Sequence, residues 1–524
     1  EIVAGTQYNK FYGTDIGRYY LDYAGLDSNL YNDEPFGSEA GLAAMSATTL
    51  VEYTNHYEKQ DVVVQFDNVA DLPGGSVQAL VGVEQIENRY SAEYDKHSEG
   101  GLVGGSAGNS GFGNRTIDSI FGEVLLPVMD NLEVTASFRR DDYSDVGEAD
   151  SFKLGALWTP VEGTVVKFNT GEGFRAPTMD DLYGATTFSA NTATDYVACA
   201  AAGVSAADCS SKQISTLITA NPNLGPETSE GFTMSVEQDM GMLVDALDGL
   251  TVRFDYYEIT VMDAISSVST QDVMWNEYVG GSALSNTVNF YDSDGVGSDG
   301  SAAGNPVGSG TVGDACPAGA TYYSTVGNDP AIYSTRSCAN GRVDYVGAGF
   351  TNVGEIEVVG YDLFVGYMRD VGPGTMSVQV DYTSMDEYNT DSFTGSNKKT
   401  NNVGFSGTPE MRNNITVGYA WDAYSVALTQ RTIGGDYYLS SDAETDAQGN
   451  PTGGIVKDGD IQDDYSALDL QIRADLGNYG VVTYGMFNVE DNDPLPGRNN
   501  NYETYLDLYG NSGLITYVKW NIKF

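Results

Sequence analysis

Apolar and polar residues alternate with a period of two along most of the chain beyond about residue 60. The last segment is typical, with Val518, Trp520 and Ile522 on one face of an extended chain and Lys519, Asn521 and Lys523 on the other. The same pattern recurs at 61–67, 376–382 and 468–476. Each such segment predicts a β-strand with one apolar face, which either a soluble core or lipid could cover.

This alternation predicts fifteen strands. Their expected bounds are 59–70, 76–94, 114–127, 132–144, 150–158, 164–175, 227–239, 250–262, 355–369, 375–386, 410–420, 423–434, 464–476, 480–489 and 512–524. Gly (63 residues) and Tyr (36) are abundant while Pro (15) is scarce, which suits many strands and turns. The fold class is therefore predicted to be all-β.

The connections between these strands fall into two alternating classes. Short turns occur at 71–75, 129–131, 160–163, 370–374 and 476–478, whereas long polar loops occupy 95–113, 176–226, 263–354, 387–409, 435–463 and 490–511, with only 145–149 brief on that side. Short turns on one side and long loops on the other are typical of a transmembrane antiparallel β-barrel with periplasmic turns and extracellular loops. Residues 59–524 are accordingly expected to form strands of such a barrel in the outer membrane of a Gram-negative bacterium.

Residues 1–58 form either an extracellular loop region or the start of the barrel fragment. Fifteen is an odd number, whereas bacterial single-chain barrels close with an even number of strands. We therefore expect either one further strand in 1–58 or earlier strands that this sequence lacks. The sequence begins at Glu1 without an initiator Met or an apolar signal region, which indicates a processed or shortened N-terminus.

Composition limits the kind of partner. The 74 acidic and 25 basic residues give a formal net charge of −49, which excludes a nucleic acid held by its phosphates. An acidic balance of this size indicates a solvated surface or sites for divalent cations. No apolar run is long enough for a transmembrane helix.

The four cysteines form two local pairs in loop-like sequence. Cys199 with Cys209 and Cys316 with Cys338 are expected to form short-range disulfides in an oxidising compartment, because neither pair has metal-ligand spacing or a nearby His. The segment "YDSDGVGSDG" at 291–300 offers Asp292, Asp294 and Asp299 as ligands for a surface Ca²⁺. It departs from the EF-hand pattern, so a flexible acidic loop is the alternative interpretation.

Five motifs in order resemble those of TonB-dependent outer-membrane receptors. They are "GGSVQALVGVEQ" at 74–85, "GFRAP" at 173–177 with "NPNLGPETSEGF" at 221–232, "VGYDLFVGY" at 359–367, "MFNVEDNDP" at 486–494 and the aromatic-ended "VKWNIKF" at 518–524. The resemblance implies a 22-stranded barrel filled by an N-terminal plug, of which this chain would supply about the last 15 strands. The plug and its TonB-contacting box have no counterpart here, so this segment alone could not be energised.

The resemblance implies import of a scarce nutrient, with TonB contacted through the absent N-terminal part. Haem is disfavoured because residues 178–220 contain no His, unless Tyr183 or Tyr196 acts as the ligand. A neutral oligosaccharide suits the acidic charge better than an anionic ferric siderophore, which would need basic residues in the lumen. Candidate ligand contacts are Arg175, Tyr183, Tyr196, Tyr291, Tyr322, Tyr323, Tyr437 and Tyr438, although Arg175 can equally anchor the rim and tyrosines girdle every such barrel.

Three other functions remain open at this stage. A passive 16-stranded porin would close a barrel from this chain alone, and a surface adhesin or phage receptor would use 263–354 as its contact surface. A soluble, secreted β-protein is the third. No catalytic constellation or resident cofactor is predicted, since the only two histidines, His56 and His97, have neither triad nor metal spacing. Expected partners are outer-membrane lipid and lipopolysaccharide, TonB, and a small-molecule or oligosaccharide ligand, with a surface lipoprotein as a further candidate partner.

Overall fold

The structure, a computed structural model, describes most of the chain. The described residues are 1–22, 25–26, 38–100, 102–104, 107–108, 110–196, 199, 204, 209–278, 288–290, 343–352, 354–391, 399–404, 407–435, 437–445, 451–461, 463–493 and 513–522. A search of their helices finds none that is both long and apolar enough to cross a membrane.

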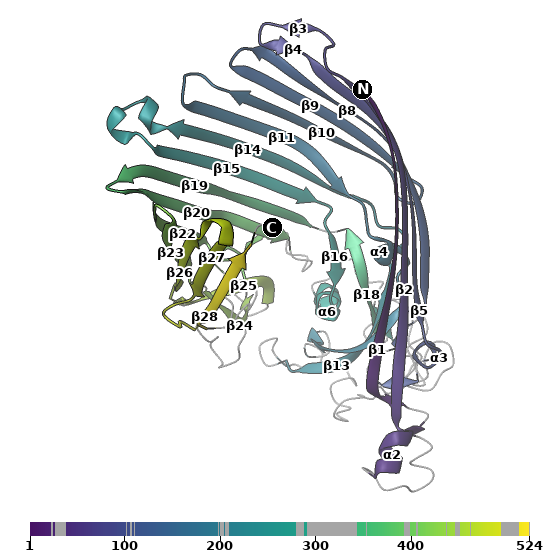
Figure 1. The fold of residues 1–524 in the computed structure, drawn as a ribbon. Helices are drawn as coiled ribbons and strands as arrows, with labels where there is room; N and C mark the ends of the chain where they lie inside the picture. Colours follow the sequence, from purple (N-terminus) through teal and green to yellow (C-terminus); the bar gives the residue numbers. More distant parts are fainter. Residues whose placement is uncertain are drawn as a thin grey trace.

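A curved sheet of long antiparallel strands dominates the fold (Figure 1). Within the described residues this sheet has 18 strands, of which β6 (Val103–Gly104) and β21 (Lys399–Asn401) are short pieces beside the ends of β1 and β20. The other sixteen, here called the wall, pair with one another in chain order. They are β1 (Ile2–Asp22), β2 (Ser46–Phe66), β5 (Gln78–Tyr94), β8 (Gly111–Met129), β9 (Leu132–Tyr143), β10 (Gly147–Trp158), β11 (Thr164–Arg175), β14 (Glu227–Asp239), β15 (Leu250–Met262), β19 (Glu355–Val371), β20 (Gly374–Asp391), β22 (Met411–Trp421), β23 (Tyr424–Ile433), β26 (Tyr465–Asp475), β27 (Val481–Phe487) and β28 (Ile515–Asn521).

The two faces of the wall differ in chemistry. Cross-strand partners share a face, so the register aligns Val64, Val81, Gly122, Phe138 and Phe152 in one row on five successive strands. Val81, Phe138 and Phe152 are 51%, 46% and 44% exposed, and rows of this kind continue to the far end of the wall at Val518 and Trp520. Apolar side chains left open on this scale face hydrocarbon, which makes this the outer, lipid-facing side of a transmembrane barrel wall.

Short turns connect the strands at one end of the wall. The turn between β19 and β20 uses Gly372, whose φ of 60° lies in the left-handed region that glycine tolerates. Three of the other connections at this end carry small elements, namely the β3–β4 hairpin (Asp71–Leu72, Gly75–Ser76), the 3-10 turns η2 (Met240–Met242) and η3 (Asp245–Leu247), and the 3-10 turn η6 (Gly477–Tyr479).

The long segments at the other end contain elements of their own. A second sheet, here called the loop sheet, has the order β16 (Ile265–Val268), β18 (Val343–Asn352), β13 (Ser211–Thr219), β12 (Thr187–Thr194) and β7 (Ala107–Gly108), with β17 (Val288–Phe290) beside β18. The helices among the described residues are α2 (Glu39–Ala44), α3 (Lys96–Glu99), α4 (Met179–Tyr183) and α6 (Thr270–Tyr278), and β24 (Tyr437–Thr445) pairs with β25 (Pro451–Ile461). β16, α6, β18 and β13 lie in the hollow of the curved wall, away from the β3–β4 turn (Figure 1).

The wall contains one strand more than the fifteen that the alternation predicts. The additional strand is β1, which pairs with β2 almost end to end, and β2 itself begins at Ser46 rather than near residue 59. In β1, large exposed side chains occur at both parities, for example Tyr8 and Tyr12 on one face and Val3 and Phe11 on the other. This mixture hides the period of two that reveals the other strands.

The edges of the wall do not meet. Among the described residues β1 pairs with β2 and β6, β28 pairs with β27, and no ladder joins β1 to β28. The closed 16-stranded cylinder that the porin alternative requires is therefore not formed by these strands.

Candidate functional site at the loop end of the wall

Arg175 ends β11 at the rim and is held by the neighbouring strand. Its Nε and Nη2 donate to the two carboxylate oxygens of Glu227 at 2.6 and 2.8 Å, and these two residues face each other in the β11–β14 register. Glu227 also accepts the backbone amide of Ile265 at 3.0 Å, where β16 of the loop sheet begins. This bidentate pair joins two wall strands to the loop sheet, the structural role that the sequence allowed beside ligand contact.

The chain then turns back onto the inner face of the wall as the α4 segment (175–184). Pro177 is fully buried, and Thr178 and Asp181 form a reciprocal capping box at the start of α4. The Asp181 carbonyl accepts the Asn221 amide at 2.8 Å, so the "NPNL" turn is tied directly to the "FRAP" turn. The Tyr90 hydroxyl of β5 donates to Asp180 Oδ1 at 2.5 Å and fixes the helix to the wall.

A buried charge cluster lies beneath this segment. Arg115 Nε on β8 donates to both carboxylate oxygens of Asp145 at 3.0 and 2.9 Å, and its Nη1 donates to the Pro177 carbonyl at 2.9 Å. The side chains of Arg115 and Asp145 are only 7% and 9% exposed. The Tyr183 hydroxyl donates to Asp145 at 3.1 Å, and burial together with the negative charge of Asp145 raises the pKa of Tyr183.

Two glycines of β8 make room for α4. A Cβ at Gly113 would lie 2.3 Å from the ring of Tyr183, and one at Gly111 would lie 2.5 Å from the Tyr183 carbonyl oxygen. Because backbone and ring approach so closely, any other residue would displace the segment. The α4 segment is thus a fixed part of the inner surface.

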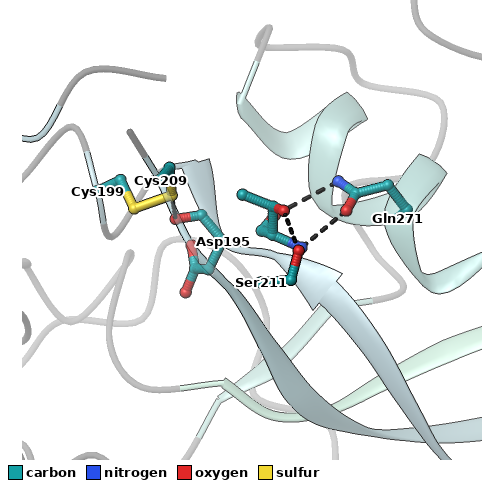
Figure 2. The surroundings of a disulfide bond; sticks show 6 residues. Asp195, Cys199, Cys209, Ser211 and Gln271 are labelled. Carbon is teal, nitrogen blue, oxygen red and sulfur yellow. Dashed lines mark hydrogen bonds between the residues drawn. A yellow bond between two sulfur atoms is a disulfide. The ribbon is translucent and has the colours of Figure 1, made fainter. Parts of the chain in front are cut away.

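The loop sheet has its own small core. Ala193, Ile214, Val268, Val346 and the α6 residues Val273 and Met274 form a buried apolar cluster. Gln271 of α6 clamps the edge of β12, because its Oε1 accepts the Thr194 amide at 2.7 Å and its Nε2 donates to the Thr194 carbonyl at 3.4 Å (Figure 2).

The Cys199–Cys209 disulfide lies beside this clamp, and the Cys209 sulfur lies 3.6 Å from the Asp195 carbonyl (Figure 2). This disulfide confirms one of the two predicted pairs, and Cys316 and Cys338 lie outside the described residues. The loop sheet is therefore a packed unit with a covalent tie.

The inner face of the wall below the rim is polar and charged. Arg139 bridges Glu84 and Asp141 through contacts of 2.7 Å each, Lys59 also pairs with Glu84, and Ser119 donates to Asp141. Further towards the short turns, a recess of about 340 Å³ is lined by Lys153, Lys167, Glu123 and Glu133 among others. Within the described part of the chain neither lysine has an ion-pair partner. A wall with an apolar outer face and a polar, charged inner face is the lining expected of a polar lumen.

The structure brings together only some of the candidate residues. Arg175 and Tyr183 both belong to the α4 segment, while Tyr196 follows β12 in the loop sheet. Tyr437 and Tyr438 lie in β24, and Tyr291, Tyr322, Tyr323, Asp292, Asp294 and Asp299 fall outside the described residues. Among the residues that are described, no group of three or more acidic, His or Cys side chains is arranged to hold a metal ion.

Sequence reasoning missed the Arg115–Asp145 pair and the Glu84–Arg139 network. The available signal was a charged residue next to an apolar one within a predicted strand, as Glu84 follows Val83 and Arg139 follows Phe138. Arg115 lies between Asn114 and Thr116 and carries no such signal. Which of them meet depends on strand register, which the alternation leaves open.

Comparison with known proteins agrees with this architecture. The sequence profile of the family described as "TonB dependent receptor-like, beta-barrel" matches residues 3–489. No curated protein matches the sequence.

Among solved structures, the siderophore receptor PirA from Acinetobacter baumannii is 14% identical with a TM-score of 0.55, and the match covers 99% of this chain and 59% of that one. A mutant of the ferric enterobactin receptor PfeA from Pseudomonas aeruginosa is 16% identical with a TM-score of 0.58, and the match covers 99% of this chain and 58% of the receptor. The outer membrane transporter YddB from Escherichia coli is 10% identical with a TM-score of 0.51, and the match covers 86% of this chain and 52% of the transporter.

At these identities the solved structures show the fold alone, and the chain spans between 52% and 59% of their lengths. The profile match, in contrast, extends over most of the chain and includes the wall from β1 to β27. Its members are outer-membrane receptors and transporters of Gram-negative bacteria, a class distinct from enzymes. The chain belongs to the TonB-dependent receptor-like β-barrel family.

Proposed function

We propose that this chain forms most of the barrel of a transporter that imports a scarce nutrient across the outer membrane with energy supplied through TonB. The observation that carries the proposal is the combination of a polar inner wall with an α4 segment and a loop sheet packed over its outer end. Such an entrance binds a solute before it passes, whereas simple diffusion needs no folded entrance. The nutrient is an oligosaccharide or a ferric siderophore.

The family supports TonB as the energy-coupling partner, reached through a part of the protein outside this sequence. Lipid and lipopolysaccharide surround the outer face of the wall, whose exposed rows of Val, Phe and Trp suit them. A surface lipoprotein that covers the loop sheet is a further proposed partner. The passive porin is the weaker candidate, because the described strands leave the β1 and β28 edges unjoined.

Uptake measurements test the proposal directly. The complete protein is expressed in cells that lack their own outer-membrane receptors for the compounds supplied, in otherwise identical strains with and without TonB. We expect accumulation of radiolabelled oligosaccharides or ferric siderophores at nanomolar to micromolar supply only when TonB is present. Equal accumulation in both strains, together with steady conductance of the purified protein in planar bilayers, would establish a porin instead.

A further inference from the structure

A second cavity lies at the loop end, apart from the ion pairs that hold the α4 segment. It has a volume of about 270 Å³ and is enclosed by β2 and β5 of the wall on one side and by the α4–β12 connection, β13 and β18 on the other. The lining residues that bear on binding are Tyr53, Tyr90, Ala92, Tyr94 and Asp180.

The strand register builds an aromatic recess on the wall side. Tyr90, Ala92 and Tyr94 alternate on the inner face of β5, and Tyr53 of β2 is the cross-strand partner of Ala92. The small Ala92, which is 2% exposed, lies between the flanking rings and forms part of the cavity lining. Three tyrosines and this alanine therefore make up the wall side of the cavity.

The opposite side supplies a single charge. Asp180 accepts the Tyr90 hydroxyl at 2.5 Å through Oδ1, which leaves Oδ2 as a hydrogen-bond acceptor beside the cavity. The lining contains no Lys, Arg or His. An anionic ligand would thus meet a carboxylate with no compensating cation, at a considerable cost in free energy.

We propose that this cavity binds one ring of a neutral sugar, with a tyrosine ring stacked on its C–H face and Asp180 accepting its hydroxyl groups. Carboxylate and phenol oxygens match the donors and acceptors of vicinal hydroxyls, and aromatic rings cover the apolar face of a pyranose. The volume lies just below the usual range of ligand pockets, so it accommodates one ring rather than a whole siderophore. This inference rests on the proposed function and selects the oligosaccharide from the two nutrient classes.

Binding is tested on the complete protein in detergent, with an array of neutral glucan, xylan, mannan and galactan oligosaccharides and with ferric enterobactin as an anionic probe. Saturation-transfer NMR on the best sugar then identifies the ring that contacts aromatic side chains. The variants are Tyr94→Ala, which removes one ring, Ala92→Phe, which fills the recess, and Asp180→Asn, which removes the charge and keeps the shape. Tyr479→Ala is the control, because this tyrosine is 74% exposed at a short turn and its side chain has no part in the cavity.

We expect Tyr94→Ala to weaken sugar binding by about ten- to a hundredfold, the range for losing one buried ring. Ala92→Phe abolishes binding, Asp180→Asn weakens it by roughly two- to tenfold, and Tyr479→Ala leaves it unchanged. Unaltered heat-modifiability of each variant on SDS gels shows that the barrel still forms.

Three outcomes overturn the inference. They are sugar binding that the cavity variants leave intact, binding of no neutral oligosaccharide on the array, and binding of the anionic probe that Ala92→Phe abolishes. None of these bears on energised transport, because the requirement for TonB is measured separately by uptake. Loss of that requirement with sugar binding intact would instead refute the proposed function.

Discussion

Replacing Arg115 by alanine tests whether a buried ion pair holds the α4 segment against the wall. The change removes the two hydrogen bonds to Asp145 and the one to the Pro177 carbonyl. It leaves the Asp145 carboxylate, whose side chain is 9% exposed, with the Tyr183 hydroxyl as its remaining side-chain donor among the described residues. Breaking a buried pair from one side costs about 3–5 kcal/mol.

The cost falls on local opening rather than on the whole barrel, because both contacts end in the segments between wall strands. We therefore expect amide hydrogen exchange in α4 to accelerate by about two to four orders of magnitude. Exchange in the strands near β28 remains unchanged. Hydrogen exchange with mass spectrometry on the detergent-solubilised protein measures both regions in one experiment.

Two further variants make the test specific. Arg115→Ala combined with Asp145→Ala removes both charges, so the double variant is expected to exchange more slowly in α4 than the single Arg115→Ala variant. Arg140→Ala removes an exposed pair with Asp150, in which both side chains are 47% exposed, and is expected to change nothing in α4. The reasoning fails if Arg115→Ala and Arg140→Ala have the same effect.

The remaining predictions concern packing, the disulfide and pH. Gly113→Val places side-chain atoms where the Tyr183 ring lies, so protease nicking of the α4 segment is expected to increase while the barrel stays heat-modifiable. Cys199→Ser opens a disulfide with a sequence separation of 10 and is expected to lower the stability of the β12–β13 hairpin by about 2–3 kcal/mol. Faster hydrogen exchange in this hairpin would show the loss, and unchanged exchange would contradict the prediction. Burial alone would raise the pKa of Asp95, but amide hydrogen bonds from Leu50, Ser98 and His97 and the Ser98 hydroxyl lower it overall. The stability that the Asp95 carboxylate gives α3 is thus complete above about pH 4 and is lost as the pH falls through the lowered pKa of Asp95. Hydrogen exchange around α3, followed from about pH 5 down to about pH 2.5, is expected to become faster than intrinsic exchange predicts as this stability is lost.

Much of the wall can be predicted from the sequence, because each strand carries its own two-faced pattern. Segments such as 76–94 and 164–175 are found within a few residues, since a period of two is a local property of the chain. The alternation of short and long connections likewise identifies the two ends of the barrel, because connection lengths can be counted once the strands are located. The alternation does not reveal β1, because aromatic side chains occupy both of its faces, although the odd strand count had offered a further strand within 1–58 as one of its two explanations.

The loop sheet could not be predicted in this way. Its strands come from segments near 107, 187, 211, 265 and 343, and β13 pairs with β18 in parallel across more than a hundred residues. Such pairing depends on long-range packing against Val273 and Met274, not on local periodicity. The aromatic cavity follows from the same packing, which explains why Tyr53, Tyr90 and Tyr94 did not stand out among 36 tyrosines.

The placement of basic residues links the acidic composition to the choice of ligand. The chain has only 25 Lys and Arg residues, and several arginines of the inner wall and rim are tied to carboxylates, as Arg115 is to Asp145, Arg175 to Glu227 and Arg431 to Asp469. A guanidinium held in this way braces neighbouring strands and has little positive potential left for a ligand. Two lysines of the inner wall without an ion pair among the described residues, Lys153 and Lys167, line the recess nearer the short turns, beyond the entrance. At the proposed sugar-binding cavity a solute would meet tyrosine rings, hydroxyls and a carboxylate, and this lining is the basis of the proposed preference for a neutral, hydroxyl-rich molecule over an anion.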